Sequence, residues 1–219
     1  MTFYSLYCFI VILLYICKIA TFLCMKKRWK IYFVIGIVLG GIGILRYSYR
    51  NPSSLALPRD LSHVQTGDII LSVGYSFKSE LVKSLEKASA HSTDYSHIGI
   101  FLRTEDSLCI VHMSIDDNCI KRENLNQFIV NNKVLEYDVF RMKNIVFSRK
   151  KLSVFMDSLL RAGKTFDHTF NIKDDESFYC TEFVYNAFKQ AGAARLEEIT
   201  YNQYLYPNDF VSSGLFVKL

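Results

Sequence analysis

The stretch His97-Ile98-Gly99-Ile100-Phe101-Leu102 and, after a polar connection, Leu108-Cys109-Ile110-Val111-His112-Met113 decide the fold class of this chain. Both runs are apolar and rich in β-branched and aromatic residues, which favours strands, and the short connection between them predicts a hairpin. Neighbouring strands of a hairpin bring side chains of one face close together. We therefore expect His97 and His112 to lie side by side, although the sequence leaves the register open.

Further strands and helices are expected on both sides of this hairpin. A turn at Gly67-Asp68 leads into a strand over residues 69–72, and residues 134–142 predict another strand. Apolar residues at helical spacing predict helices over residues 77–90 and 152–160, the second of which ends at Gly163. Because the strands look antiparallel and are segregated from the helices, we expect an α+β fold.

The last clear helix begins near Cys180. Apolar residues recur from there at helical spacing, at positions 180, 183, 184, 187, 188 and 191. Asp174, Asp175, Glu176 and Ser177 precede it, a composition that is expected of an N-terminal cap. Cys180 is therefore predicted in the first turn of the helix, on its apolar face.

The positive charge of the chain is concentrated near its N-terminus. The chain of 219 residues carries 26 Lys and Arg against 21 Asp and Glu, a net charge of +5. Residues 1–50 contain seven of the basic residues and none of the acidic ones. These basic residues flank two apolar runs, residues 2–25 and 31–45, so the charge does not indicate nucleic-acid binding. The partner that this segment predicts is a membrane lipid bilayer.

Residues 1–50 are expected to form a membrane-anchor or signal region. Met25-Lys26-Lys27-Arg28-Trp29-Lys30 and the second apolar run resemble a secretory start, which makes Met25 a candidate for the true start. Since no small-residue cleavage site follows, we expect an uncleaved anchor. Basic clusters stay cytoplasmic, so the remaining chain is expected on the periplasmic or extracellular side. Residues 51–63 are predicted to be a linker and residues 64–219 the folded domain.

Cys180 and His97 carry the chemistry that the sequence predicts. The unpaired N–H groups and the positive dipole end of a helix start favour a thiolate, and they can donate to an oxyanion. A thiol nucleophile needs an imidazole, and that imidazole needs an orienting partner. We therefore expect His97 as the base and His112 as its partner. The alternative for Cys180 taken alone is a small buried apolar residue.

Three motifs together resemble the NlpC-type papain-like cysteine hydrolases: Gly67-Asp68-Ile69-Ile70, Ser96-His97-Ile98-Gly99-Ile100 and Phe178-Tyr179-Cys180-Thr181-Glu182. The histidine precedes the cysteine, which resembles the circularly permuted YiiX-like branch over residues 64–212. The resemblance implies a permuted papain-like domain that acts on a peptide, amide or ester through Cys180 and His97. Many members carry Glu at the third position, whereas His112 here resembles the lecithin:retinol acyltransferase relatives.

Several functions remain open at this point. The leading hypothesis is an amidase or peptidase acting on cell-wall peptides outside the cytosol. The alternatives are a lipid-directed thiol acyltransferase or esterase, a non-catalytic membrane-tethered binding module, and a structural protein held by a Cys109–Cys119 disulfide.

No cofactor is expected, because the predicted domain has no Gly-rich phosphate loop. A zinc site at His97, His112 and Cys180 is chemically conceivable, but a thiol at a helix start has the simpler explanation given above. Asp68, Tyr95 and Glu182 are expected to have structural roles: a turn, core packing and helix structure, respectively.

Overall fold

The computed structural model describes residues 56, 60–75, 95–144, 146–170, 176–201 and 204–219. The chain divides into two compact units, Met1–Asn51 and Pro52–Leu219, and all described residues belong to the second. The predicted anchor runs, most of the predicted linker and the predicted helix over residues 77–90 lie outside the described residues. Within the described ranges, no helix is long and apolar enough to cross a membrane.

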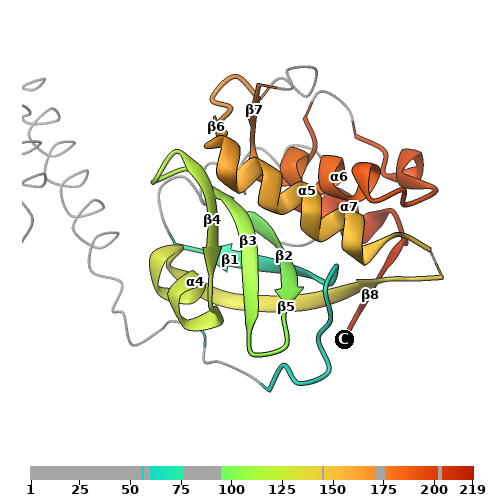
Figure 1. The fold of residues 1–219 in the computed structure, drawn as a ribbon, viewed down its shortest axis with the longest axis horizontal. Helices are drawn as coiled ribbons and strands as arrows, with labels where there is room; N and C mark the ends of the chain where they lie inside the picture. The colour runs from blue at the N-terminus through green and yellow to red at the C-terminus, as the bar shows by residue number, and fades with distance from the viewer. Residues whose placement is uncertain (1–55, 57–59, 76–94, 145, 171–175, 202–203) are drawn as a thin grey trace, which may run out of the picture. The chain divides into compact units, whose positions relative to one another are not determined.

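The centre of the described unit is a six-stranded antiparallel sheet (Figure 1). Its strands lie in the order β4-β3-β2-β1-β5-β8. Their bounds are β1 Ile69–Gly74, β2 His97–Arg103, β3 Leu108–Ser114, β4 Cys119–Glu123, β5 Val134–Met142 and β8 Phe216–Lys218. The predicted hairpin is β2–β3, and the strands predicted around residues 69–72 and 134–142 are β1 and β5, so these predictions are confirmed.

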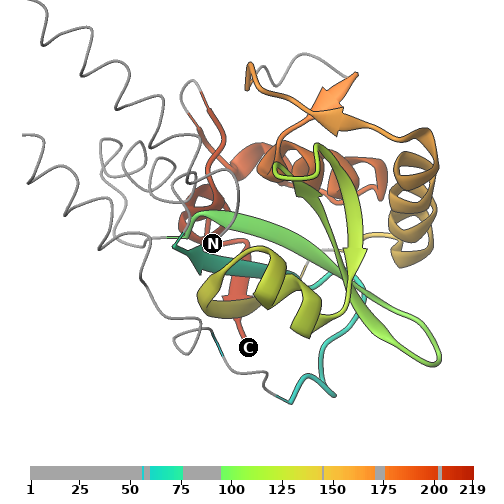
Figure 2. The same cartoon turned by 90° about the vertical axis from the view of Figure 1, so that its left-hand side faces the viewer.

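Helices cover both faces of this sheet, and β2 is therefore buried along most of its length (Figures 1 and 2). One face packs against helices α5 (Arg149–Ala162), α6 (Cys180–Gln190) and α7 (Pro207–Ser212), and the other against α4 (Leu125–Asn131). A 3-10 helix, η2 (Leu196–Glu198), and a small parallel pair, β6 (Thr165–Phe166) with β7 (Ser177–Phe178), complete the described elements. This α+β arrangement agrees with the predicted fold class.

Side-chain alternation along β2 and β3 divides the core in two. Ile98, Ile100 and Val111 join the cluster that contains the apolar stripe of α6. Phe101 and Ile110 point to the other face and pack with Phe128 of α4. Because His97 is two residues from Gly99 and four from Phe101 on the same strand, its side chain belongs to the α4 face of the sheet.

The two long helices begin and end for local reasons. Helix α5 starts after Ser148, whose hydroxyl oxygen accepts a hydrogen bond from the Lys151 backbone N–H, and it ends at Gly163 in the left-handed conformation, as predicted. The cap prediction for α6 was wrong. Ser177 lies in β7, and the N-cap is Tyr179, whose backbone N–H donates to the Glu182 carboxylate at 3.3 Å. Glu182 therefore has the structural role that was predicted for it.

Candidate active site

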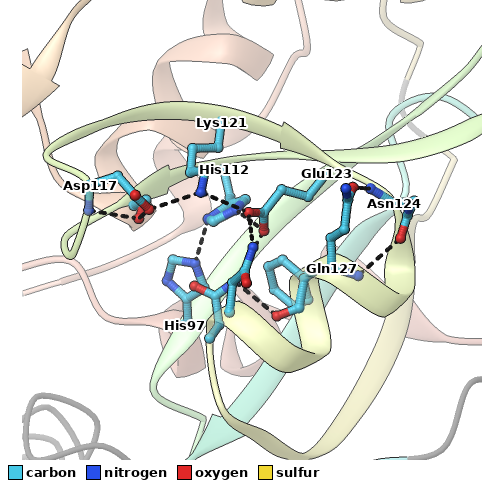
Figure 3. A network of polar contacts seen from close by, with 11 residues as sticks. His97, His112, Asp117, Lys121, Glu123, Asn124 and Gln127 are labelled. Carbon is cyan, nitrogen blue, oxygen red and sulfur yellow. Dashed lines mark hydrogen bonds and ion pairs between the residues drawn. The ribbon is translucent and has the colours of Figure 1, made fainter. Parts of the chain in front are cut away.

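Strands β2 and β3 bring the two predicted histidines together (Figure 3). The antiparallel register pairs Ile100 with Val111, so that His97 and His112 become diagonal neighbours on one face of the sheet. His97 Nε2 lies 2.9 Å from His112 Nδ1, and the two rings meet edge to face. The sequence-based expectation that these residues lie side by side is confirmed at the level of geometry.

A carboxylate that the sequence analysis missed continues this contact. Glu123 is the last residue of β4 and pairs with Ile110 across β3–β4, on the same face as His112. Its Oε2 lies 3.0 Å from His112 Nε2, and the side chain is only 4 % exposed. The available signal was an acidic residue at the end of a short polar-apolar strand after the hairpin, which by itself says nothing about its neighbours.

Helix α4 covers the two histidines on the face of the sheet opposite to α5, α6 and α7. Asn124 caps this helix: its Oδ1 accepts from the Gln127 backbone N–H at 2.9 Å, while Gln127 Oε1 accepts from the Asn124 N–H at 3.0 Å. The helix then places the ring of Phe128 parallel to that of His97 and edge to face with that of His112. An apolar ring thus covers one side of both imidazoles, of which His112 is fully buried and His97 partly buried.

Burial and charge shape the protonation of this set. Burial, together with the neighbouring His112, lowers the pKa of His97 from 6.5 to about 3, while Glu123 acts in the opposite direction. Burial alone would raise the pKa of Glu123, but hydrogen bonds from His112, Asn131 and Lys121 outweigh it and lower that pKa from 4.5 to about 2. At neutral pH His97 is therefore neutral and Glu123 ionised.

Cys180 is the first residue of α6, as predicted, and its side chain is half-buried. Helix α6 packs against β2 and β3, the two strands that carry the histidines. His97 contacts His112 through a hydrogen bond. That bond uses His97 Nε2, so Nδ1 is the other ring nitrogen of His97.

The sequence matches the family model of the permuted papain-like amidase enzymes of the YaeF/YiiX, C92 family over residues 63–215. The chain belongs to this family. As a member of the C92 family it is a cysteine hydrolase with a permuted papain-like domain. No curated relative matches the sequence.

A solved structure supports the same fold. It is the crystal structure of a protein named metalloprotein yiiX, from Escherichia coli O157:H7, which is 21 % identical to this chain. The superposition covers 71 % of this chain and 96 % of that one, with a TM-score of 0.55. In the described part of this C92 family member, no cluster of three or more His, Cys, Asp or Glu side chains is arranged to hold a metal ion.

Asp68 and Tyr95 make contacts that stabilise the fold, as expected from the sequence. Asp68 accepts from the Gln65 backbone N–H and forms an ion pair with Arg141, which fixes the turn into β1. Tyr95 packs on Phe140 and donates its hydroxyl to Asp138 at 2.5 Å, as expected of a core residue.

The predicted alternative of a Cys109–Cys119 disulfide is wrong, because both residues are free thiols. The register explains this. Cys119 pairs with Ser114 at one end of β3, while Cys109 lies near the other end, opposite Leu102.

Proposed function

We propose that this C92 family member hydrolyses amide bonds of peptides with Cys180 as nucleophile, His97 as general base and His112 as the residue that orients His97. The observation that supports the proposal is the His97–His112 hydrogen bond on β2 and β3, the strands against which α6 packs, together with the position of Cys180 as the first residue of α6. Family membership supplies the amidase chemistry, and the contact supports this choice of atoms.

The proposed reaction follows from these atoms. Sγ of Cys180 gives its proton to Nδ1 of His97 and forms a bond to the substrate carbonyl carbon, whose π electrons move to oxygen. The first N–H groups of α6 would donate to that oxyanion. When the C–N bond breaks, His97 returns the proton to the leaving amine. Water then attacks the thioester with His97 as base, which releases the acid and restores the thiol.

The resting state of the pair follows from the burial of His97. Since the pKa of this imidazole is held near 3, His97 is a neutral base at rest, and the proton moves when the Cys180 thiol reacts. The ring of Phe128 stacks on the imidazole of His97 and keeps water from that face of the base. The thiolate that forms is compensated by the imidazolium beside it and by the helix N-terminus.

Two further features belong to the same proposal. We propose that residues 1–50 anchor the chain to a membrane and that the domain acts on the periplasmic or extracellular side, where cell-wall peptides are the substrate class. The support is the arrangement of basic residues around the two apolar runs. A lipid-directed esterase or acyltransferase is the second candidate, because the Cys–His–His set and a predicted anchor would suit an acyl substrate near the bilayer.

The test is the rate at which iodoacetamide alkylates Cys180 in the purified full-length chain, followed by mass spectrometry between pH 5 and pH 10. We expect His97→Ala to lower this rate at pH 7 at least about tenfold, since the base that removes the proton is lost. The matched control is His63→Ala, because His63 is an exposed histidine outside the network. Cys109 is an internal control, since burial raises the pKa of its thiol.

Equal alkylation of Cys180 in the His97→Ala and His63→Ala variants would refute the catalytic pair. Hydrolysis of a fluorogenic peptide amide, compared with a short-chain acyl ester at equal concentration, separates the two candidate functions. A preference for the ester that Cys180→Ala abolishes would favour the lipid-directed alternative.

A further inference from the structure

We propose that Glu123 is a positioning residue of this active site, which sets the proton positions on His112 and His97 and thereby directs the lone pair of His97 Nδ1 toward the thiol. The inference rests on the proposed function and extends it by one residue. The site is then a relay of four groups that runs from Glu123 through His112 and His97 to Cys180.

Glu123 lies in a site built to hold an ionised carboxylate (Figure 3). Its Oε1 accepts from Asn131 Nδ2 at 2.7 Å and faces Lys121 Nζ at 3.0 Å. Its Oε2 accepts from Asn132 Nδ2 at 3.4 Å and lies 3.0 Å from His112 Nε2. The amides and the ammonium can only donate to these oxygens, and the side chain is almost fully buried.

An ionised carboxylate determines the tautomer of each imidazole in turn. Because Glu123 can only accept, His112 must carry its proton on Nε2, and a neutral His112 then has a lone pair on Nδ1. That lone pair lies 2.9 Å from His97 Nε2, so His97 must donate from Nε2. A neutral His97 is left with its lone pair on Nδ1, which is the form that can take a proton from a thiol.

The charge of Glu123 also has a role when the proton moves. A neutral His112 can orient His97 but stabilises an imidazolium less than a carboxylate does. Burial and His112 both oppose a positive charge on His97, and Glu123 is the group that favours it. Many family members carry Glu where this chain has His112. Here Glu123 supplies the carboxylate, through its contact with His112.

The groups around Glu123 determine how strongly its negative charge acts on His112 and His97. Lys121, on the same strand, bridges Glu123 and Asp117 and is partly exposed, so it weakens but does not cancel the negative charge. From α4 and its C-cap, the neutral amides of Asn131 and Asn132 and the ring of Phe128 face this group. On β3 the facing group is His112 itself.

The decisive variant is Glu123→Gln in the full-length chain. The new NH₂ group must face donors, either Asn131 and Lys121 or His112 and Asn132. The Lys121 ammonium can only donate and holds the amide oxygen on its side, so the NH₂ group faces His112, which can accept; the two imidazoles then reverse their tautomers and His97 presents an N–H to the thiol. Glu123→Asp keeps the charge on a shorter stem, and Asp68→Asn is the matched control, because Asp68 is a carboxylate of similar burial outside the network.

Two measurements report on the relay without requiring a known substrate. The first is the ¹⁵N shift of the ring nitrogens, assigned with His97→Ala and His112→Ala, which tells Nε2–H from Nδ1–H tautomers. We expect Nε2–H on both histidines of the unaltered protein at pH 7, and loss of that state in Glu123→Gln. The second is the alkylation rate of Cys180 by iodoacetamide as a function of pH.

We expect Glu123→Gln to lower the alkylation rate at pH 7 at least about tenfold, because His97 loses the tautomer that can accept the thiol proton, and Glu123→Asp to recover most of it. Asp68→Asn should leave the pH profile unchanged. An unaltered pH profile and unaltered tautomers in Glu123→Gln would overturn the inference. If Glu123→Gln fails to fold, Asn131→Ala replaces it as the test. This variant removes one donor to the carboxylate and should also lower the alkylation rate of Cys180, by a smaller factor.

The outcomes separate this inference from the proposed function. A strong effect of His97→Ala with none of Glu123→Gln leaves the catalytic pair intact and overturns the relay. No effect of His97→Ala on Cys180 overturns both, whatever the tautomers are.

Discussion

Replacing Gly99 by alanine should disturb the site from within the sheet. Gly99 lies on β2 between His97 and Phe101, where the backbone passes very close to β3. A Cβ added there would lie 2.7 Å from Ile110 Cγ2, 3.2 Å from His112 Cβ and 3.3 Å from the Val111 carbonyl oxygen. Since all three atoms belong to β3, the added methyl group pushes directly on the strand that holds His112.

The size of the effect follows from the closest contact. Ordinary contact begins at 3.4 Å, so Ile110 Cγ2 must move from 2.7 Å by about 0.7 Å. This methyl group is attached to the Cβ of a fully buried residue, so it moves only if Ile110 rotates about χ1 or the two strands separate. Overpacking of this kind costs about 1–3 kcal/mol, which corresponds to a decrease in Tm of roughly 2–12 °C for a domain of this size.

The assay is a double-mutant cycle in urea. Ile110→Leu removes Cγ2 at nearly constant volume and should by itself cost less than about 1.5 kcal/mol. In Gly99→Ala/Ile110→Leu the clash is relieved, so the free energies of unfolding should couple favourably by about 0.5 kcal/mol or more. Alkylation of Cys180 should recover with the stability, because His112 returns to its place.

The reasoning would be refuted if Gly99→Ala changed the free energy of unfolding by less than about 0.5 kcal/mol, or if the two substitutions were additive. Either result would mean that β2 and β3 separate at little cost and that the close approach at Gly99 does not position His112.

Two further predictions concern α4 and the buried imidazole. Asn124→Ala should lower the free energy of unfolding by about 1 kcal/mol, because it removes the oxygen that caps α4; urea unfolding measures this, and an unchanged midpoint would contradict it. Burial and His112 lower the pKa of His97 from 6.5 to about 3, so its contribution to stability is complete above pH 6.5 and is lost as the pH falls toward 3. His97→Gln should therefore flatten the dependence of the unfolding free energy on pH between 6.5 and 4.5, a window above the titration of Glu123; slopes equal to those of the unaltered chain would show that His97 is not held neutral.

Local patterns were sufficient where an element is long and its neighbours in the chain define it. The run from His97 to Leu102 is continuous and apolar, which suits a strand buried on both faces, and β2 has that burial. Gly163 ends α5 where the apolar stripe ends. The stripe from Cys180 to Ala191 is the buried face of α6, so the first-turn position of the thiol could be predicted from periodicity alone.

Short helices and strands could not be predicted from such patterns. Helix α4 has 7 residues, and strands β6 and β7 have 2 each, which is too little for a period to stand out. The sequence analysis predicted the N-terminal cap of α6 too early in the chain, because it missed the short strand β7. Acidic and hydroxyl residues precede the helix, but the pairing of β7 with β6 takes Ser177 into an extended strand, and the first turn is closed by Glu182 instead.

From the sequence alone follow the α+β class, the β2–β3 hairpin, Cys180 at a helix start, and the pair of His97 and His112 as chemical candidates, because residue type and spacing are properties of the chain itself. Only the tertiary structure decided that Glu123 lies beside His112 and that Phe128 covers both rings. The reason is register: a shift of one residue between β3 and β4 would turn Glu123 to the opposite face of the sheet, and no local pattern determines that pairing.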